Sequence, residues 1–226
     1  MLSAIPAVAA RGDGPGVAKT PRPRLDAPAH FPLTAGASWW YDVIYDSLGR
    51  SFEFGYRVRS RSGDDYKGRP SVRLDTSLAT GKRRKEVLQR EHYSLSPSGD
   101  VLCLARDNGS IHVPFAPPQV LLKNGALAGE AWTWEGTFKG RQARSTTRFV
   151  GPRSLSLKGR RFDCIVIEIE ARDAARTTAL RRRLWFARGA GLVQELCDDL
   201  REGAPGRLEG RLSRWDPPGP TEPRKE

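Results

Sequence analysis

The sequence predicts an all-β fold: a single domain of about eleven antiparallel strands in a curved sheet or open barrel, with little helix. Three observations predict this fold. Apolar residues between positions 31 and 215 recur with a period close to two, which is the side-chain period of a strand. Turn signals divide these runs at close spacing. The length of 226 residues suits one domain with a substantial core.

The expected strands follow the turn signals along the chain. They cover residues 39–47, 51–61, 71–78, 84–96, 131–138, 142–150, 153–157, 162–172, 178–186, 192–200 and 206–215. A three-stranded meander over residues 87–114 completes the prediction. The proline-rich residues 114–118 are expected to end that part of the sheet, because proline cannot donate to a strand ladder.

Two tight turns set the expected register of the meander. Ser98-Gly99 and Asn108-Gly109 each have the composition of a two-residue turn. Counting back and forth from them gives one apolar face, made by Tyr93, Leu95, Leu102, Leu104, Ile111 and Val113. In this register Leu95 lies opposite Leu102, and Leu104 lies opposite Val113.

The hairpin over residues 162–172 and 178–186 has a register that satisfies both of its faces. Glu168 is expected opposite Arg183, and Glu170 opposite Arg181. On the other face the same register brings apolar residues together, including Ile167 and Leu184.

The charge is strongly basic, with 38 Lys and Arg against 26 Asp and Glu and a formal net charge of +12. This excess excludes an acidic partner-mimic and is typical of proteins that attract nucleic acid, anionic polymers or anionic lipid. It also fits the arginine-rich composition of a GC-rich genome. The candidate anion-binding residues are Arg57, Arg59, Arg61, Arg181 and Arg183. The alternative for Arg181 and Arg183 is that they are ordinary sheet-surface residues paired with Glu170 and Glu168, which leaves Arg57, Arg59 and Arg61 unexplained.

Two histidines are the weak candidates for a metal site. The predicted register puts His92 opposite Ala105 and Ala105 opposite His112, so the imidazoles share one row two strands apart. A catalytic zinc needs a third protein ligand, and that row supplies none. We therefore expect no metal, no cofactor and no enzyme activity, with the two histidines on a solvated face. The three cysteines lack a C-x-x-C spacing, and buried thiols are their expected state.

Aromatic residues are the candidates for binding an apolar ligand. Trp132, Trp134, Phe186, Phe52 and Phe54 either line a cavity in the concave face or fill the core. No run of 18 apolar residues occurs, so no transmembrane helix is expected.

The two ends of the chain are expected to lie outside the domain. Residues 1–30 are predicted to be a disordered segment or linker, because glycine, proline and alanine dominate residues 11–30. Residues 1–10 end in small residues like a signal-peptide cleavage region but lack a basic start, so they are a signal-peptide remnant or a disordered end. The β domain is expected over residues 31–215, and residues 216–226 form a frayed tail.

One short pattern occurs twice. Gly36, Trp39 and Tyr41 share the form G-x-x-W-x-aromatic with Gly129, Trp132 and Trp134, 93 residues later. Both copies begin a strand. They indicate either a duplicated half-fold or two independent ways to start a strand with a buried indole.

Several of these motifs together resemble a known group of proteins. Residues 31–41 (FPLTAGASWWY), 161–164 (RFDC) and 185–193 (WFARGAGLV) carry the resemblance. The chain resembles uncharacterised bacterial exported or lipoprotein-like β-proteins with FPL-x-x-G-x-x-W-x-Y and W-F-x-x-G-x-G-L-V markers. It departs from them at residues 158–161 (KGRR), where many have V-P-A-G. The resemblance implies a β fold and export, and it transfers no catalytic residue.

These observations predict a non-enzymatic cell-envelope β-domain that binds or scaffolds an apolar ligand or a partner protein. The expected location is the periplasm or envelope, and the cytoplasm if residues 1–10 are no signal. The alternative function is a basic-faced module for nucleic acid or anionic polysaccharide.

Overall fold

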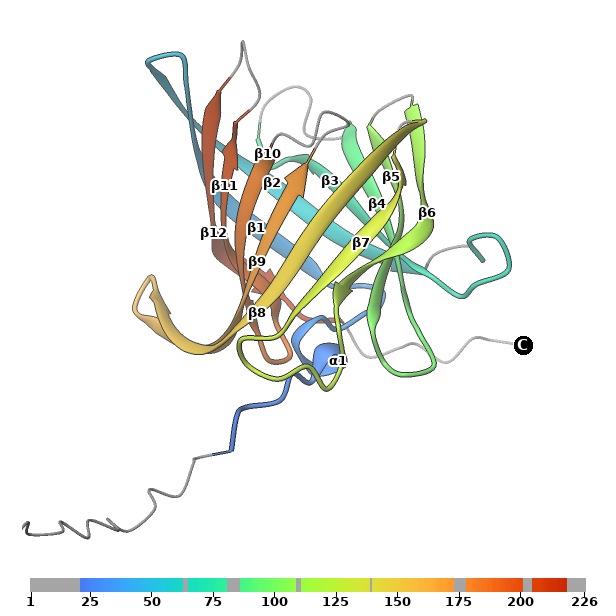
Figure 1. Cartoon of the computed structure of the whole chain (residues 1–226). Coiled ribbons are helices and arrows are strands. Elements are labelled where there is room, and N and C mark those ends of the chain that lie inside the picture. The colour runs from blue at the N-terminus through green and yellow to red at the C-terminus, as the bar shows by residue number, and fades with distance from the viewer. Residues whose placement is uncertain are drawn as a thin grey trace, which may run out of the picture.

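Each strand pairs with its neighbours in the chain and β1 pairs with β12, so the twelve strands of the described residues close into an antiparallel barrel (Figure 1). The computed structural model describes residues 21–62, 65–80, 86–108, 111–138, 140–172, 178–200 and 205–218. The strands are β1 (Ser38–Ser47), β2 (Arg50–Ser62), β3 (Val72–Leu78), β4 (Val87–Leu95), β5 (Val101–Asn108), β6 (Ile111–Leu122), β7 (Ala131–Phe138), β8 (Arg141–Leu157), β9 (Arg160–Arg172), β10 (Thr178–Ala187), β11 (Gly191–Asp199) and β12 (Gly206–Asp216). One short helix, α1 (Ala27–His30), precedes them.

This architecture confirms the all-β antiparallel fold, and two strands run further than predicted. β6 continues through Pro114 and Pro117, where an end of the sheet is expected. Its prolines are tolerated because β6 shares a single ladder pair with β7, between Ala116 and Thr137. β8 crosses the predicted break at residues 150–153 by a bulge at Gly151, whose φ of 134° suits glycine.

The predicted register of the β9–β10 hairpin is confirmed. Arg183 lies opposite Glu168 and Arg181 opposite Glu170, while Leu184 lies opposite Ile167. The acidic and basic residues face outward, and the apolar residues face the barrel interior, where Ile167 and Leu184 are buried.

The predicted register of the meander is wrong in both of its hairpins, by one residue in the first and by two in the second. A bulge at His92 and Tyr93 moves Leu95 from Leu102 to Val101, although His92 keeps its predicted partner, Ala105. Asn108 then pairs with Ile111, so the chain turns one residue later than the Asn108-Gly109 turn predicts. Residues 109 and 110 lie outside the described residues. His112 consequently faces Asp107 instead of Ala105.

The core consists of two clusters of buried side chains inside the barrel, one of which includes residues beside α1, which lies at the lower end in Figure 1. Its largest fully buried side chains include Phe149, Phe186 and Ile167, which project inward from β8, β10 and β9. Trp39 closes the same end by donating its indole N–H to the carbonyl of Ala190 at 2.6 Å.

The segment over residues 21–33 also belongs to this lower end, which differs from the predicted linker over residues 1–30. Leu25 is 2% exposed, and its N–H donates to the carbonyl of Ala126 at 2.9 Å. Asp26 caps α1 and forms an ion pair with Arg188. Residues 1–20 lie outside the described residues, as do residues 219–226 of the predicted tail.

Some positions correspond between the first six strands, β1–β6, and the last six, β7–β12. The offset of 93 residues between the two G-x-x-W patterns recurs at inner-face positions, where Leu74 corresponds to Ile167 and Tyr93 to Phe186. It recurs on the outer face in a charged pair, because Asp75 lies opposite Arg90 in one half and Glu168 opposite Arg183 in the other. This correspondence favours a duplicated half-fold.

Candidate functional site

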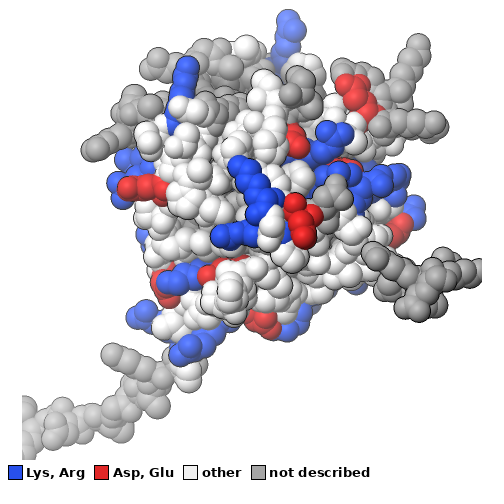
Figure 2. All heavy atoms as spheres, turned by 90° about the vertical axis from the view of Figure 1, so that its right-hand side faces the viewer, with Lys and Arg blue, Asp and Glu red and all other residues white. Residues whose placement is uncertain are grey.

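The two predicted groups of arginines lie on the outer face but not together. Arg57, Arg59 and Arg61 project from β2, whereas Arg181 and Arg183 project from β10. β1, β12 and β11 separate the two strands. In the side view of Figure 2, basic and acidic side chains interleave among wide uncharged areas.

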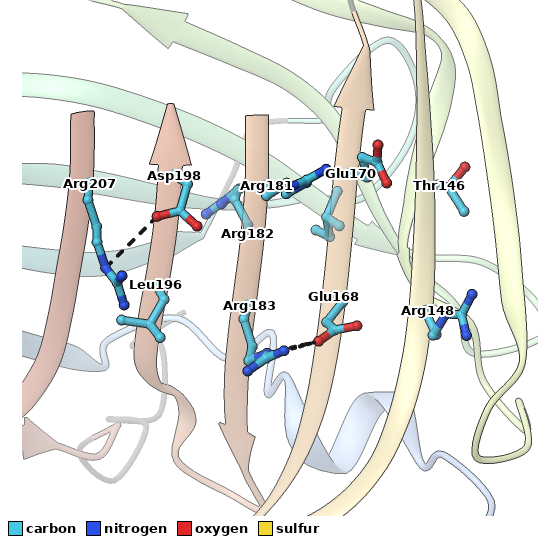
Figure 3. Close-up of a pocket in the computed structure, with 11 residues that line it drawn as sticks. Thr146, Arg148, Glu168, Glu170, Arg181, Arg182, Arg183, Leu196, Asp198 and Arg207 are labelled. Carbon is cyan, nitrogen blue, oxygen red and sulfur yellow. Dashed lines mark hydrogen bonds and ion pairs between the residues drawn. The ribbon is translucent and has the colours of Figure 1, made fainter. Parts of the chain in front are cut away.

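The β10 arginines lie in a shallow groove of about 440 Å³ on the outer face of β8–β12 (Figure 3). Its charges alternate along two rows that cross the strands. Arg148, Glu168 and Arg183 form one row, and Glu170, Arg181, Asp198 and Arg207 form the other. Arg183 is ion-paired with Glu168, and Arg207 lies 3.9 Å from Asp198. The alternation of acidic and basic side chains favours the interpretation that Arg181 and Arg183 are ordinary sheet-surface residues.

The β2 arginines have a different environment. The guanidinium of Arg57 stacks on one face of Trp40, and that of Arg214 lies on the same ring, each at 4.5 Å from its centroid. Arg61 forms an ion pair with Asp75 at 2.9 Å, and Arg59 lies opposite Asp75 in the β2–β3 register.

Two further arginines, Arg73 and Arg90, lie near Asp75, and the sequence did not predict either of them. Arg73 Nε lies 2.9 Å from its carboxylate and Arg90 Nε lies 3.9 Å away. The Asp75 side chain is only 8% exposed, because the arginines cover it. The β2–β3 register brings these residues together. The sequence does not predict this register, because the connection over residues 63–71 is too long to be a tight turn.

The predicted aromatic set does not line one cavity. Trp134 and Phe186 are buried in the core, and Trp132 packs against it. Phe52 and Phe54 lie at the upper end of β2, 49% and 39% exposed. They are nevertheless inner-face residues, because Phe54 lies opposite Val43, which is 2% exposed.

Two ion pairs face the interior above the core. Arg106 Nε donates to Glu91 at 2.8 Å, and Arg182 Nε donates to Glu195 at 2.8 Å. The four side chains remain 12–31% exposed. Burial alone would raise the pKa of Glu91, but Arg106 and then Arg182 outweigh burial and hold that pKa below its ordinary value. Since β4 and β10 lie on opposite sides of the barrel order, these charges interact across the lumen.

The two histidines come together on the outer face through Asp107. His112 Nδ1 donates to Asp107 at 2.5 Å, and its Nε2 then accepts from the hydroxyl of Tyr66 at 2.9 Å. His92 Nε2 lies 3.6 Å from the other oxygen of Asp107. Within the residues described, no group of three His, Cys, Asp or Glu side chains is arranged to hold a metal ion. The arrangement fastens Tyr66, and with it the β2–β3 connection, to the barrel wall.

The three cysteines are free thiols; Cys103 and Cys164 are buried, and Cys197 is half-buried. Burial raises the pKa of Cys103 to about 12. Cys103 faces the interior opposite Tyr93, whereas His112 faces outward, so the two form no nucleophile–base pair. Burial likewise raises the pKa of Cys164 and of Cys197 to about 11.

Comparison with known proteins finds similarity at the level of structure alone. No family profile and no curated protein sequence matches the chain. A candidate exported protein of Bacteroides fragilis with a YmcC-like fold is similar with a TM-score of 0.49 and 13% identity, over 82% of this chain and 98% of that one. A candidate lipoprotein of Parabacteroides distasonis has a TM-score of 0.41 and 10% identity, over 85% and 100%. Among the helices of the described residues, none has the length and apolar character needed to cross a membrane.

Proposed function

We propose that the protein is a non-enzymatic binding domain of the cell envelope that takes an apolar or amphiphilic ligand into the upper end of its barrel. One observation carries this proposal. Phe52 and Phe54 are inner-face residues, yet 49% and 39% of each is exposed, while Val43 beside Phe54 is 2% exposed. At these two positions β2 extends past its last pair with β3, Tyr56 with Leu78, so within the described residues no β3 side chain covers them, and exposed apolar side chains grouped in this way mark interaction sites.

The upper end of the barrel around Phe52 and Phe54 is called the apolar rim below. The charged residues beneath it support the same function. Ligand sites are mostly apolar and contain a few polar groups that fix the orientation of the ligand. Arg106 and Arg182 stand between the packed core and the apolar rim, and their side chains are 31% and 22% exposed. A ligand that enters past Phe52 would meet these groups at its inner end.

The state of the buried nucleophiles favours binding over catalysis. A catalytic thiol needs a depressed pKa, and burial raises the pKa of Cys103 to about 12. The envelope location rests on the resemblance of residues 31–41 and 185–193 to exported β-proteins.

Binding of an uncharged apolar probe tests this function. N-phenyl-1-naphthylamine brightens in apolar surroundings, so its titration into the protein reports a saturable apolar site. We expect the double variant Phe52→Ser/Phe54→Ser to bind the probe at least about tenfold more weakly, because it removes most of the apolar rim. The double variant Ile44→Ser/Leu48→Ser is the control, since Ile44 is exposed on the outer face and Leu48 in the turn. An equal loss in the control, or no saturable binding by the wild type, would contradict the proposal.

A further inference from the structure

The outer face of β2, β3 and β4 carries four arginines around one carboxylate. In the strand register Arg59 and Arg90 lie on either side of Asp75, and Arg61 lies opposite Arg73. Arg61 and Arg73 both reach back to Asp75 at 2.9 Å. We refer to Arg59, Arg61, Arg73 and Arg90 as the arginine ring.

The charges of the ring do not balance. Four guanidinium groups face two carboxylates: Asp75, which the arginines share, and Asp107, which lies opposite Arg90 on β5 and also accepts a hydrogen bond from His112. Like charges directly opposite each other on a sheet destabilise it, and Arg61 faces Arg73 in this way. Among the described residues of this face, positive charge therefore exceeds negative charge.

The second half of the barrel has a comparable group of charges without the like-charged pair. There Arg148 and Arg183 lie on either side of Glu168, matching Arg59 and Arg90 around Asp75. The row that corresponds to Arg61 and Arg73 holds Gly151 opposite Val166. The like-charged pair of Arg61 and Arg73 thus has no counterpart in the second half of the barrel.

Solvent meets the guanidinium groups of the ring and not the carboxylate. The side chains of Arg61, Arg90 and Arg73 are 51%, 40% and 31% exposed, whereas Asp75 is 8% exposed. Guanidinium groups bind carboxylate and sulfate in planar, two-point contacts. On an open face a single small anion would be screened by salt, so a polymer that offers several anionic groups fits better.

The aromatic residues nearby separate two kinds of polymer. Proteins that bind single-stranded nucleic acid stack bases on open aromatic rings. Here Arg57 and Arg214 lie over Trp40, and the ring of Tyr66 packs against His92 and His112. Neither ring is open for stacking, and the guanidinium groups are the contact that this face provides.

We propose that the arginine ring is a binding site for an anionic polysaccharide. This site is distinct from the apolar rim, because it lies on the outer face of the sheet whose inner face carries Phe54. It also differs from the groove on β8–β12, where each arginine of the two rows has an acidic neighbour.

Heparin, a sulfated polysaccharide, is the probe, and two double variants carry the test. Arg59→Gln/Arg90→Gln removes two charges beside Asp75, and Arg148→Gln/Arg183→Gln removes the two corresponding charges beside Glu168. Both change the net charge equally. We expect the first variant to bind heparin about tenfold more weakly, with a salt dependence reduced by roughly one to two contacts, and the second to stay within about twofold of the wild type. Equal losses in both variants would show that binding follows net charge alone, and would overturn the proposal.

Two further measurements keep the test decisive. Arg61→Gln alone removes the like-charged pair. Asp75 is little disturbed, because it keeps its ion pair with Arg73. This single variant is therefore used if a double variant fails to fold. It is expected to weaken heparin binding about threefold or more, and unchanged binding would count against the site. A single-stranded oligonucleotide that binds the wild type more tightly than heparin, and loses affinity on Arg61→Gln, would replace polysaccharide by nucleic acid and overturn the assignment.

Discussion

The indole Nε1 of Trp134 donates a hydrogen bond to the backbone carbonyl of Pro117 at 2.8 Å, across the least-paired seam of the barrel. β6 and β7 share one ladder pair, so side chains replace the missing backbone bonds. Trp132 does the same one step lower by donating to the carbonyl of Val120 at 3.0 Å. Trp132 and Trp134, two of the aromatic residues predicted to line a ligand cavity, therefore connect β7 to β6.

We expect Trp134→Phe to lower the free energy of unfolding by about 1–3 kcal/mol, because the carbonyl of Pro117 loses its donor in a part-buried seam. Urea denaturation measures this loss. Trp185→Phe is the matched control, since Trp185 faces outward on β10, opposite Val166. A loss in the control as large as in Trp134→Phe would mean that ring size, and not the hydrogen bond, matters.

The parts of the fold that the sequence predicts are those whose register is set locally on both faces. In the β9–β10 hairpin the pair of Glu168 and Arg183 and the pair of Ile167 and Leu184 demand the same register, so no shift satisfies either better. The meander lacks this double constraint. The bulge at His92 shifts the pairing of β4 with β5. It changes the apolar pattern of the sequence too little for the bulge to be predicted.

The sequence does not predict the arginine ring, for a related reason. Arg61 and Asp75 become neighbours only through the β2–β3 register, which the intervening connection does not dictate. The sequence identifies Arg57, Arg59 and Arg61 as one basic face of a strand, and the structure adds Arg73 and the shared carboxylate.

Asp75→Asn should lower the free energy of unfolding by about 1–3 kcal/mol. Removing one partner of a buried ion pair costs about 3–5 kcal/mol, and the exposure of the arginines reduces that figure here. Asp42→Asn is the control, because Asp42 pairs with Lys158 in an ion pair whose two side chains are both 63% exposed. That variant should change stability by no more than about 1 kcal/mol in urea denaturation. Equal effects would show that Asp75 is not the charge centre of its face.

Leu25→Ala tests whether the segment before β1 is part of the barrel. We expect a loss of about 2–4 kcal/mol in the free energy of unfolding, because Leu25 is 2% exposed within the core. The predicted linker would give almost no change. Leu48→Ala, at a turn residue that is 72% exposed, should stay within about 0.5 kcal/mol. Thermal or urea unfolding distinguishes the two expectations.

The acid sensitivity of the barrel should come first from His92. Burial lowers the pKa of His92 below its ordinary 6.5, with Arg73 and His112 acting in the same direction and Asp107 opposing them. The unfolded chain then binds a proton at a pH where the folded chain does not, so stability falls as the pH drops below about 6.5. Glu91 belongs to a lower range, because its depressed pKa costs stability only as the pH falls below about 4.5.

The range between pH 4.5 and 6.5 therefore isolates the histidine. We expect urea midpoints of the wild type to decline across that range and those of His92→Asn to decline less, because asparagine carries no titrating proton. Identical slopes in the two proteins would show that His92 keeps an ordinary pKa. A matching loss of heparin binding at low pH is not expected, since protonation of His92 adds positive charge beside Arg73 and the arginine ring.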